Sequence, residues 1–424
     1  MMRVVVLLLL VSWSALAEVV LHVGPDFQLN DDDDGKRVDA VVGESFLSSV
    51  IHCRGGPWAY ADISWKFRLE DVAFEECAGG VMKVRGAEAR ANNVLFARSS
   101  SEGPAVTVSD GGYVWLSNST FTGNAGRGIV VIGGHLKLES VILWKNSGPA
   151  LWCDAGGIIT STKTTIQENV AVARPRTGSF ADGGGAWIGS NCTAKFEDAL
   201  FEGNEARPAG IGCDSPDAGC LSGRGGAVYL FRSTLFSCVG CTFRKNRVWA
   251  GTASRDGAQG GAIFAAFGEK VTCDHCVFDA NAARGRGENR HGSPVDGGAG
   301  DGGAIKMGYF GTLILKDTTF SQNFATAGVR EPARGGALSL LYVDEALTRR
   351  CQFLHNGAYG GGLVVADGLS SGGVGGAFGG AASVVACAPE FYNCLFIANS
   401  AETLGGLFAG VAATIVDAYL EPNV

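Results

Sequence analysis

One four-residue phrase, an apolar residue followed by two variable residues and an asparagine, recurs along most of the chain. It reads FTGN at Phe121 and FRKN at Phe243. Its asparagines are Asn124, Asn146, Asn169, Asn204, Asn246, Asn281, Asn323, Asn356 and Asn399. A second phrase, Gly-Gly-Ala followed by an apolar residue, precedes four of these phrases by the same 16 residues, as from Ala227 to Phe243. Two phrases in fixed phase predict a solenoid of stacked repeats.

The residues after each Gly-Gly-Ala phrase alternate in polarity. Val228 and Leu230 flank Tyr229, and the corresponding later segment places Lys306 between two apolar residues. Alternation with period two predicts strands that bury one face. No amphipathic helix is indicated between these strands. The sequence therefore predicts an all-β fold, a single right-handed parallel β-helix of about a dozen coils.

Stacked coils place equivalent residues about 4.8 Å apart. We therefore expect the phenylalanines in one internal stack and the asparagines in one ladder at a bend, where asparagine tolerates left-handed backbone angles and its amide can bond to the next coil. Gly-Gly supplies another sharp corner. Later coils are longer, and the added residues all lie between the asparagine and the next Gly-Gly. These insertions are predicted to be loops that protrude on one side.

The N-terminus carries one Arg, an apolar run from Val4 and the ending Ala15-Leu16-Ala17. This pattern predicts a cleavable signal peptide over residues 1–17, a cap or linker over 18–45 and the β-helix over 46–424. No later stretch is apolar enough to predict a transmembrane segment. We expect a secreted or cell-surface protein. The net charge of -8 argues against a nucleic-acid partner.

The two repeated phrases resemble the tandem repeats of polymorphic outer-membrane proteins of chlamydial type, and the fold class resembles the pectin-lyase-like β-helices. The resemblance covers roughly residues 46 to 410. It implies a surface domain that acts in adhesion. It implies no particular activity, because a fold does not determine a function.

The chain has 13 cysteines, and secretion would make disulfides available to them. Cys53 and Cys77 occupy the asparagine position of consecutive coils, which predicts a bridge, with stacked free thiols as the alternative. Cys213 and Cys220 flank a short loop and predict a local bridge. Two Cys-x-x-Cys pairs repeat in register: Cys238 with Cys241, and Cys273 with Cys276. We predict the bridges Cys238–Cys273 and Cys241–Cys276, the alternative being a tetrahedral zinc site; no metal is predicted.

The insertions are rich in arginine and contain no lysine. The arginines are Arg174, Arg176, Arg207, Arg224, Arg247, Arg255, Arg284, Arg286, Arg290, Arg330 and Arg334. A planar guanidinium suits carboxylate and sulfate groups, so these residues are candidates to bind an acidic polysaccharide or another anionic surface partner. Acidic residues in the same loops leave open a mixed, solubilising surface. We expect a non-catalytic binding or adhesion protein.

The alternative is a carbohydrate-active enzyme, a lyase or glycosidase acting on uronate polymers. Its candidate acid and base are Asp296 and Asp301, with Arg290 and His291 nearby in the sequence. A lyase of this type would use calcium, whereas a binding protein needs no cofactor. Turn chemistry also explains Asp-Gly in this glycine-rich segment.

Overall fold

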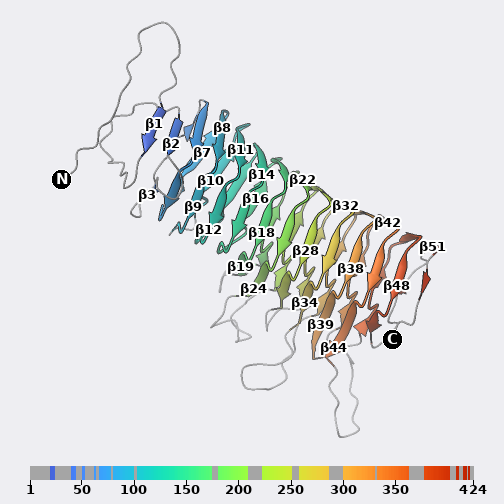
Figure 1. Cartoon of the computed structure of the whole chain (residues 1–424). Coiled ribbons are helices and arrows are strands. Elements are labelled where there is room, and N and C mark those ends of the chain that lie inside the picture. The colour runs from blue at the N-terminus through green and yellow to red at the C-terminus, as the bar shows by residue number, and fades with distance from the viewer. Residues whose placement is uncertain are drawn as a thin grey trace, which may run out of the picture.

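The computed structural model describes residues 66–77, 80–99, 103–173, 180–208, 222–250, 257–285, 299–329, 332–361 and 377–401, with a few short strands outside these ranges. Its regular secondary structure is β-strand throughout the described residues, which stack into an elongated rod (Figure 1). No helix in this part of the chain is long and apolar enough to cross a bilayer. Residues 1–17, which carry the predicted signal peptide, lie outside the described residues.

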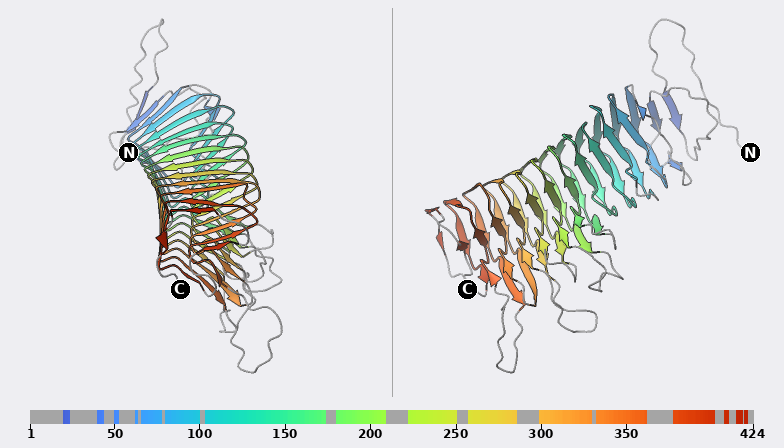
Figure 2. Two further views of the ribbon diagram at one scale, coloured as in Figure 1. Left: turned by 90° about the vertical axis from the view of Figure 1, so that its right-hand side faces the viewer. Right: turned by 180° about the vertical axis from the view of Figure 1, so that it is seen from behind.

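Each coil contributes one strand to each of three parallel sheets, named sheets A, B and C. A central coil runs from β26 (Val228–Phe231) in sheet C through β27 (Leu235–Val239) in sheet A to β28 (Thr242–Arg244) in sheet B. The described strands number 14 in sheet A, 13 in sheet B and 12 in sheet C. Figure 2 shows the coils following one another along one axis. The predicted parallel β-helix is confirmed.

Sheet A begins earlier in the chain than the repeat pattern indicates. β1 (Val20–Val23) pairs with β2 (Ala40–Gly43), and β2 pairs with β5 (Phe67–Glu70). Two strands of the expected cap or linker therefore extend the 14-stranded sheet.

The repeated phenylalanines form the core of the rod. Phe243 and Phe278 are fully buried, with ring centroids 4.6 Å apart and planes within 3° of parallel. The same stacking continues to Phe320 at 4.8 Å and Phe353 at 5.0 Å. Parallel pairing in exact register produces this column, since Phe243 lies opposite Phe278 across the two strands. Leu143 replaces phenylalanine in an early coil and fills the same buried position.

The nine repeated asparagines form one buried ladder beside this core. The Asn281 side-chain Nδ2 donates to Asn323 Oδ1 at 2.9 Å and to the Phe243 carbonyl at 2.9 Å. Its Oδ1 accepts from both the backbone N–H and Nδ2 of Asn246, at 3.1 and 3.0 Å. Equivalent bonds link every neighbouring pair from Asn124 to Asn399.

The bend at the ladder differs from the prediction in one respect. The left-handed residue is the one before the asparagine, as at Lys245 (φ 56°) and Ala280 (φ 52°), and no ladder asparagine has a positive φ. The asparagine serves the bend through its side-chain hydrogen bonds, which satisfy buried backbone groups. The Gly-Gly corner does need glycine, because Gly302 has φ +66° and a Cβ on Gly303 would lie 2.0 Å from the Gly336 carbonyl oxygen.

The insertions of the later coils form an outward extension between sheets B and C, here called the flange. Its outgoing arms build sheet D: β19 (Val170–Ala173), β24 (Glu205–Pro208), β29 (Arg247–Trp249), β34 (Ala282–Arg284), β39 (Phe324–Val329), β44 (Gly357–Gly361) and β49 (Ser400–Ala401). Its returning arms build sheet E: β20 (Ala181–Asp182), β25 (Gly223–Arg224), β30 (Ala258–Gln259), β35 (Gly300–Asp301), β40 (Ala333–Arg334) and β45 (Ala377–Phe378). Figure 1 shows β24, β34, β39 and β44 along one edge of the rod. The insertions do protrude on one side, but the segments that begin and end each insertion are strands and not loops.

Candidate functional site

Small residues hold the two arms of the flange together. Ala206 and Ala283 of sheet D are fully buried in one cluster with residues of sheet E, and Ala325 belongs to a second such cluster; both are made almost entirely of alanine. A Cβ on Gly300 would lie 2.1 Å from the Thr326 carbonyl oxygen, so only glycine permits this approach. Alternation along such short strands then directs the long side chains of each arm away from the other arm. The arginines therefore point to two separate surfaces.

Five of the eleven candidate arginines belong to described residues: Arg207, Arg224, Arg247, Arg284 and Arg334. The other six, Arg174, Arg176, Arg255, Arg286, Arg290 and Arg330, lie outside them. Arg207, Arg247 and Arg284 are on sheet D, and Arg224 and Arg334 are on sheet E. The expected single stripe is thus divided between the two arms.

Arg224 is enclosed between the flange and sheet C. It forms a two-pronged ion pair with Asp182, with both N–O distances at 2.8 Å. Its Cζ lies 3.7 Å from the Phe180 ring centroid and 4.8 Å from that of Tyr229. Tyr229 faces away from the core yet is buried, because the returning arm covers it. Burial raises the pKa of Asp182 against the opposing effect of Arg224. This pair fastens the flange and leaves no free cation for a ligand.

Asp301, one of the candidate catalytic carboxylates, is buried in a second charged cluster. Lys306 Nζ lies 3.4 Å from Asp301 Oδ2 and donates to Ser339 Oγ at 3.0 Å. Arg334 Nη1 lies 3.4 Å from Asp301 Oδ1. The carboxylate is held between two cations and is 7% exposed, which is unsuitable for an acid or base that must reach a substrate. Asp296, Arg290 and His291 lie outside the described residues.

The outer face of sheet D presents a different arrangement, here called the Arg–Trp patch: Arg247, Trp249, Arg284 and Phe324. Trp249 lies opposite Arg284 across β29 and β34. Arg284 Cζ lies 5.1 Å from the Trp249 ring centroid and 5.0 Å from that of Phe324. Two aromatic rings from different coils therefore fix the position of one guanidinium.

The cations of the Arg–Trp patch have no counter-ion among the residues that the structure describes. Neither Arg247 nor Arg284 pairs with a carboxylate of the described residues, whereas Arg207 has Glu205 at 3.8 Å. Arg284 Nε and Trp249 Nε1 are shielded from solvent and have no hydrogen-bond acceptor. Burial and, next, the charge of Arg247 lower the pKa of Arg284. An anion placed here would relieve the repulsion and accept the unpaired donors.

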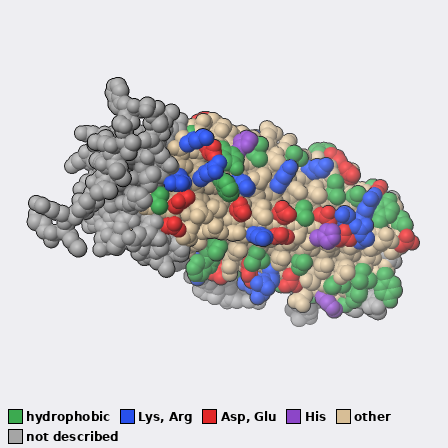
Figure 3. Space-filling view, turned by 45° about the horizontal axis from the view of Figure 1, so that its top comes forward, with side chains coloured by type: hydrophobic (Ala, Val, Ile, Leu, Met, Phe, Trp, Pro, Cys, Tyr) green, Lys and Arg blue, Asp and Glu red, His purple; other side chains and the backbone are tan. Residues whose placement is uncertain are grey.

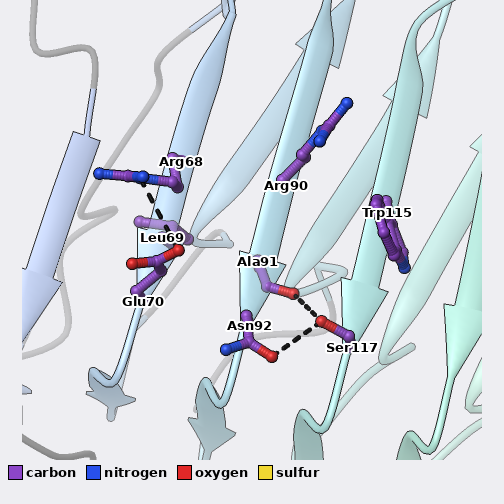
Figure 4. Close-up of a pocket in the computed structure, with 8 residues that line it drawn as sticks. All are labelled: Arg68, Leu69, Glu70, Arg90, Ala91, Asn92, Trp115 and Ser117. Atoms are coloured by element: carbon purple, nitrogen blue, oxygen red, sulfur yellow. Dashed lines mark hydrogen bonds and ion pairs between the residues drawn. The ribbon is translucent and has the colours of Figure 1, made fainter. Parts of the chain in front are cut away.

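A shallow pocket of about 270 Å³ lies on the outer face of sheet A, and sequence reasoning missed it (Figure 4). It is lined by Arg68, Leu69, Glu70, Arg90, Ala91, Asn92, Trp115 and Ser117. Its cations already have partners, since Arg90 Nε donates to Glu88 Oε1 at 2.7 Å and Arg68 Nε lies 3.8 Å from Glu70. Acidic and basic side chains also intermingle on the face shown in Figure 3. This pocket offers less to an anion than the Arg–Trp patch does.

One group of described residues has the spacing of metal ligands. Ligand atoms of Asp274, His275 and Asp317 lie within 4.8 Å of one another. Lys316 Nζ lies 3.2 Å from Asp274 Oδ2, and Arg350 Nη2 donates to Asp317 Oδ2 at 2.5 Å. Arg350 lowers the pKa of Asp317 through this bond. Both carboxylates therefore have cationic partners that a metal ion would have to displace.

Neither of the predicted bridges, Cys238–Cys273 and Cys241–Cys276, is formed in this structure, where all four cysteines are buried free thiols. Cys238 and Cys273 do lie in register, as expected. The thiol of Cys238 interacts instead with that of Cys241, across the corner of its own coil. The thiols of Cys241 and Cys276 do interact with each other, as their register position leads one to expect, but no disulfide joins them. Burial raises the pKa of Cys238, whereas the side-chain hydrogen bond from Cys241 lowers the pKa of Cys276.

The structure contains a disulfide that the repeat did not predict, Cys153–Cys192, with a Cα separation of 6.3 Å. It joins a strand of sheet C to a corner in the next coil, so its cysteines do not share a register position. Cys77 is disulfide-bonded, and its predicted partner Cys53 lies outside the described residues, as do Cys213 and Cys220.

Comparison with known proteins supports the architecture. The family model for the right handed beta helix region matches residues 60–222. Among solved structures, the chain is similar to the catalytic domain of GH87 alpha-1,3-glucanase in complex with nigerose, at 13% identity and a TM-score of 0.35. A variant of that domain, also in complex with nigerose, gives 13% identity and a TM-score of 0.28. Each match covers 95% of this chain and 64% of the other, so the chain spans less than two thirds of their length.

No curated protein gives a significant match. The chain is an all-β protein built as a right-handed parallel β-helix.

Proposed function

We propose that this protein is a secreted or cell-surface binding protein, without catalytic activity, whose flange holds an acidic polysaccharide. The observation that carries the proposal is the pair of neighbouring arginines, Arg247 and Arg284, that have no counter-ion in the described structure. Two uncompensated guanidinium groups beside a tryptophan cost stability, and a protein retains such an arrangement for a ligand. A sulfate or uronate carboxylate supplies the missing charge and the missing acceptors.

The geometry of the flange suits a polymer. Successive coils repeat the outgoing arm about 4.8 Å apart, so anionic groups along one chain can meet several coils. The rings of Trp249 and Phe324 hold Arg284 in place before binding, which reduces the entropy lost when a ligand is bound. The repeat resemblance to surface adhesion domains agrees with this role.

The enzyme alternative has less support in this structure. Asp301 is buried between Lys306 and Arg334, so it is not free to act as an acid or base. Release of unsaturated uronate products from polygalacturonate in the presence of calcium would nevertheless overturn the non-catalytic assignment.

Binding of dextran sulfate and polygalacturonate, measured by isothermal titration calorimetry against uncharged dextran, tests the proposal. We expect binding to the two polyanions that weakens as salt rises past about 0.15 M, where the screening length is about 8 Å. Arg247→Gln/Arg284→Gln should weaken it at least ten-fold. Lys195→Gln/Lys270→Gln is the matched control, because it removes the same charge from exposed positions on sheet A. Equal loss in both double variants, or no binding at low salt, would refute the flange site.

A further inference from the structure

A second surface, on the corner between sheets C and A, carries exposed aromatic side chains in consecutive coils. Phe267, Tyr309, Phe310 and Tyr342 are 52%, 43%, 69% and 50% exposed, and they are here called the aromatic corner. Phe267 and Tyr309 have ring centroids 5.4 Å apart, and Tyr309 and Tyr342 have theirs 6.2 Å apart. The rings form a row along the rod, with at least one ring for each of three coils. This surface is not part of the flange.

The backbone at this corner does not favour aromatic residues. Phe267, Tyr309, Phe310 and Tyr342 have φ values of 77°, 59°, 68° and 54°. A left-handed backbone is strained for bulky L-residues. Other coils hold smaller or polar residues at the equivalent position, with the same left-handed backbone: Asp110 (φ 52°), Gly133 (φ 61°), Ala155 (φ 51°) and Arg232 (φ 58°). What distinguishes these three successive coils is therefore the exposure of large aromatic side chains at the corner, which is typical of a binding surface.

The geometry of the rings indicates what they can bind. The planes of Phe267 and Tyr309 are within 10° of parallel, yet their centroids are further apart than two faces in contact, so the rings are offset and part of each face is free. Among the described residues, no cation lies over any ring of the aromatic corner, in contrast to Tyr229, which has Arg224. The matching ligand is therefore uncharged and apolar on one side.

We propose that the aromatic corner binds a linear, uncharged β-linked polysaccharide, whose pyranose rings stack on the aromatic rings through their C–H faces. Neighbouring ring centroids in the row are 5.4 and 6.2 Å apart, close to the coil height of roughly 4.8 Å. A sugar in an extended β-linked chain advances by a similar length, so consecutive sugars can meet consecutive coils. A coiled α-linked chain would leave such a row after a few sugars. This site is independent of the flange, because it needs no charge.

The test uses the full chain with cellohexaose and chitohexaose in calorimetry, and with microcrystalline cellulose in sedimentation assays. The variant is Tyr309→Asn/Phe310→Asn/Tyr342→Asn. Asparagine tolerates left-handed backbone angles, so the melting temperature should stay unchanged or rise. We expect at least a ten-fold loss of affinity. Leu235→Thr, which removes a 50% exposed apolar side chain from sheet A, should leave binding unchanged.

Three results would overturn this proposal. The first is that the wild type binds neither oligosaccharide, and the second is that the triple variant binds them as well as the wild type does. The third is self-association of the wild type that the triple variant abolishes, which would make a second copy of the chain the partner. Affinity should not change with salt between about 0.05 and 0.5 M, because no ion pair is involved. Arg247→Gln/Arg284→Gln should bind these neutral sugars normally, which separates this site from the flange.

Discussion

Replacing Asn281 by alanine removes one step from the middle of the asparagine ladder. Four hydrogen bonds are lost: two that its Nδ2 donates, to Phe243 O and Asn323 Oδ1, and two that its Oδ1 accepts from Asn246. Asn323 Oδ1 retains one donor, the backbone N–H of residue 281, at 3.1 Å. The backbone N–H of Asn246 and one of its Nδ2 hydrogens lose their partners, whereas the Phe243 carbonyl stays in the ladder with the strand of Phe278.

The expected cost follows from these orphaned groups. Each buried polar group left without a partner costs about 1 to 3 kcal/mol. Two such groups, with partial relaxation of the neighbours, predict a loss of about 2 to 5 kcal/mol at this coil. Asn281→Asp should cost a similar amount, because a carboxylate keeps the acceptor but cannot donate to Phe243 O or Asn323 Oδ1.

Hydrogen exchange measures this loss locally, which suits a repeat protein that need not unfold in one step. The Asn246 amide N–H bonds to the Asn281 side chain and to no backbone group, so its exchange should accelerate by about a hundred-fold or more. Thr242→Ala, on the outer face of sheet B, is the control. An unchanged exchange rate at Asn246, with a urea midpoint equal to that of the control, would refute the energetic role of the ladder.

Three other predictions concern buried groups. Burial raises the pKa of Glu269 to about 8 from 4.5, and neither carboxylate oxygen accepts a hydrogen bond of normal geometry. The contribution of Glu269 to stability is therefore full below pH 4.5 and is lost as the pH rises through about 8, so Glu269→Gln should be more stable than the wild type by up to about 3 kcal/mol at pH 7 in urea titrations. Equal stability of the wild type at pH 5 and pH 8 would contradict this. Reducing the Cys153–Cys192 bridge, which closes a segment with a sequence separation of 39, should lower stability by about 4 kcal/mol at most, and an unchanged midpoint under reductant would argue against a structural role. Alkylation after denaturation without reductant should label Cys241 and Cys276, because both are free thiols in this structure. Recovery of the two cysteines as a disulfide-linked peptide pair would contradict this and show that the bridge forms.

Sequence reasoning predicts the fold well because the core and the ladder each depend on one contact repeated in every coil. Phe243 and Asn246 occur at the same offset from Gly-Gly-Ala as Phe278 and Asn281, and parallel register turns that offset directly into vertical contacts. The prediction placed the left-handed backbone at the asparagine, whereas the structure has it one residue earlier, as at Lys245. The sequence shows which residue is constant and not which one has the left-handed backbone.

The candidate sites could not be predicted in the same way, because they depend on how the insertions fold. Strands as short as Ala258–Gln259 show no periodicity, so the sequence did not indicate that the returning arm would cover Tyr229 and enclose Arg224. Tyr309 and Tyr342 appear as isolated aromatics until the coils are stacked. The Cys153–Cys192 bridge joins unlike positions and is invisible to a search for repeats.

A crystal structure of the protein with a defined sulfated oligosaccharide would show directly whether the flange binds acidic glycans through the Arg–Trp patch. We predict a sulfate group within about 2.7 to 3.2 Å of the Arg284 guanidinium and close to Arg247, with a sugar ring against Trp249. A ligand bound only in the sheet A pocket, with Arg247 and Arg284 still unpaired, would contradict it.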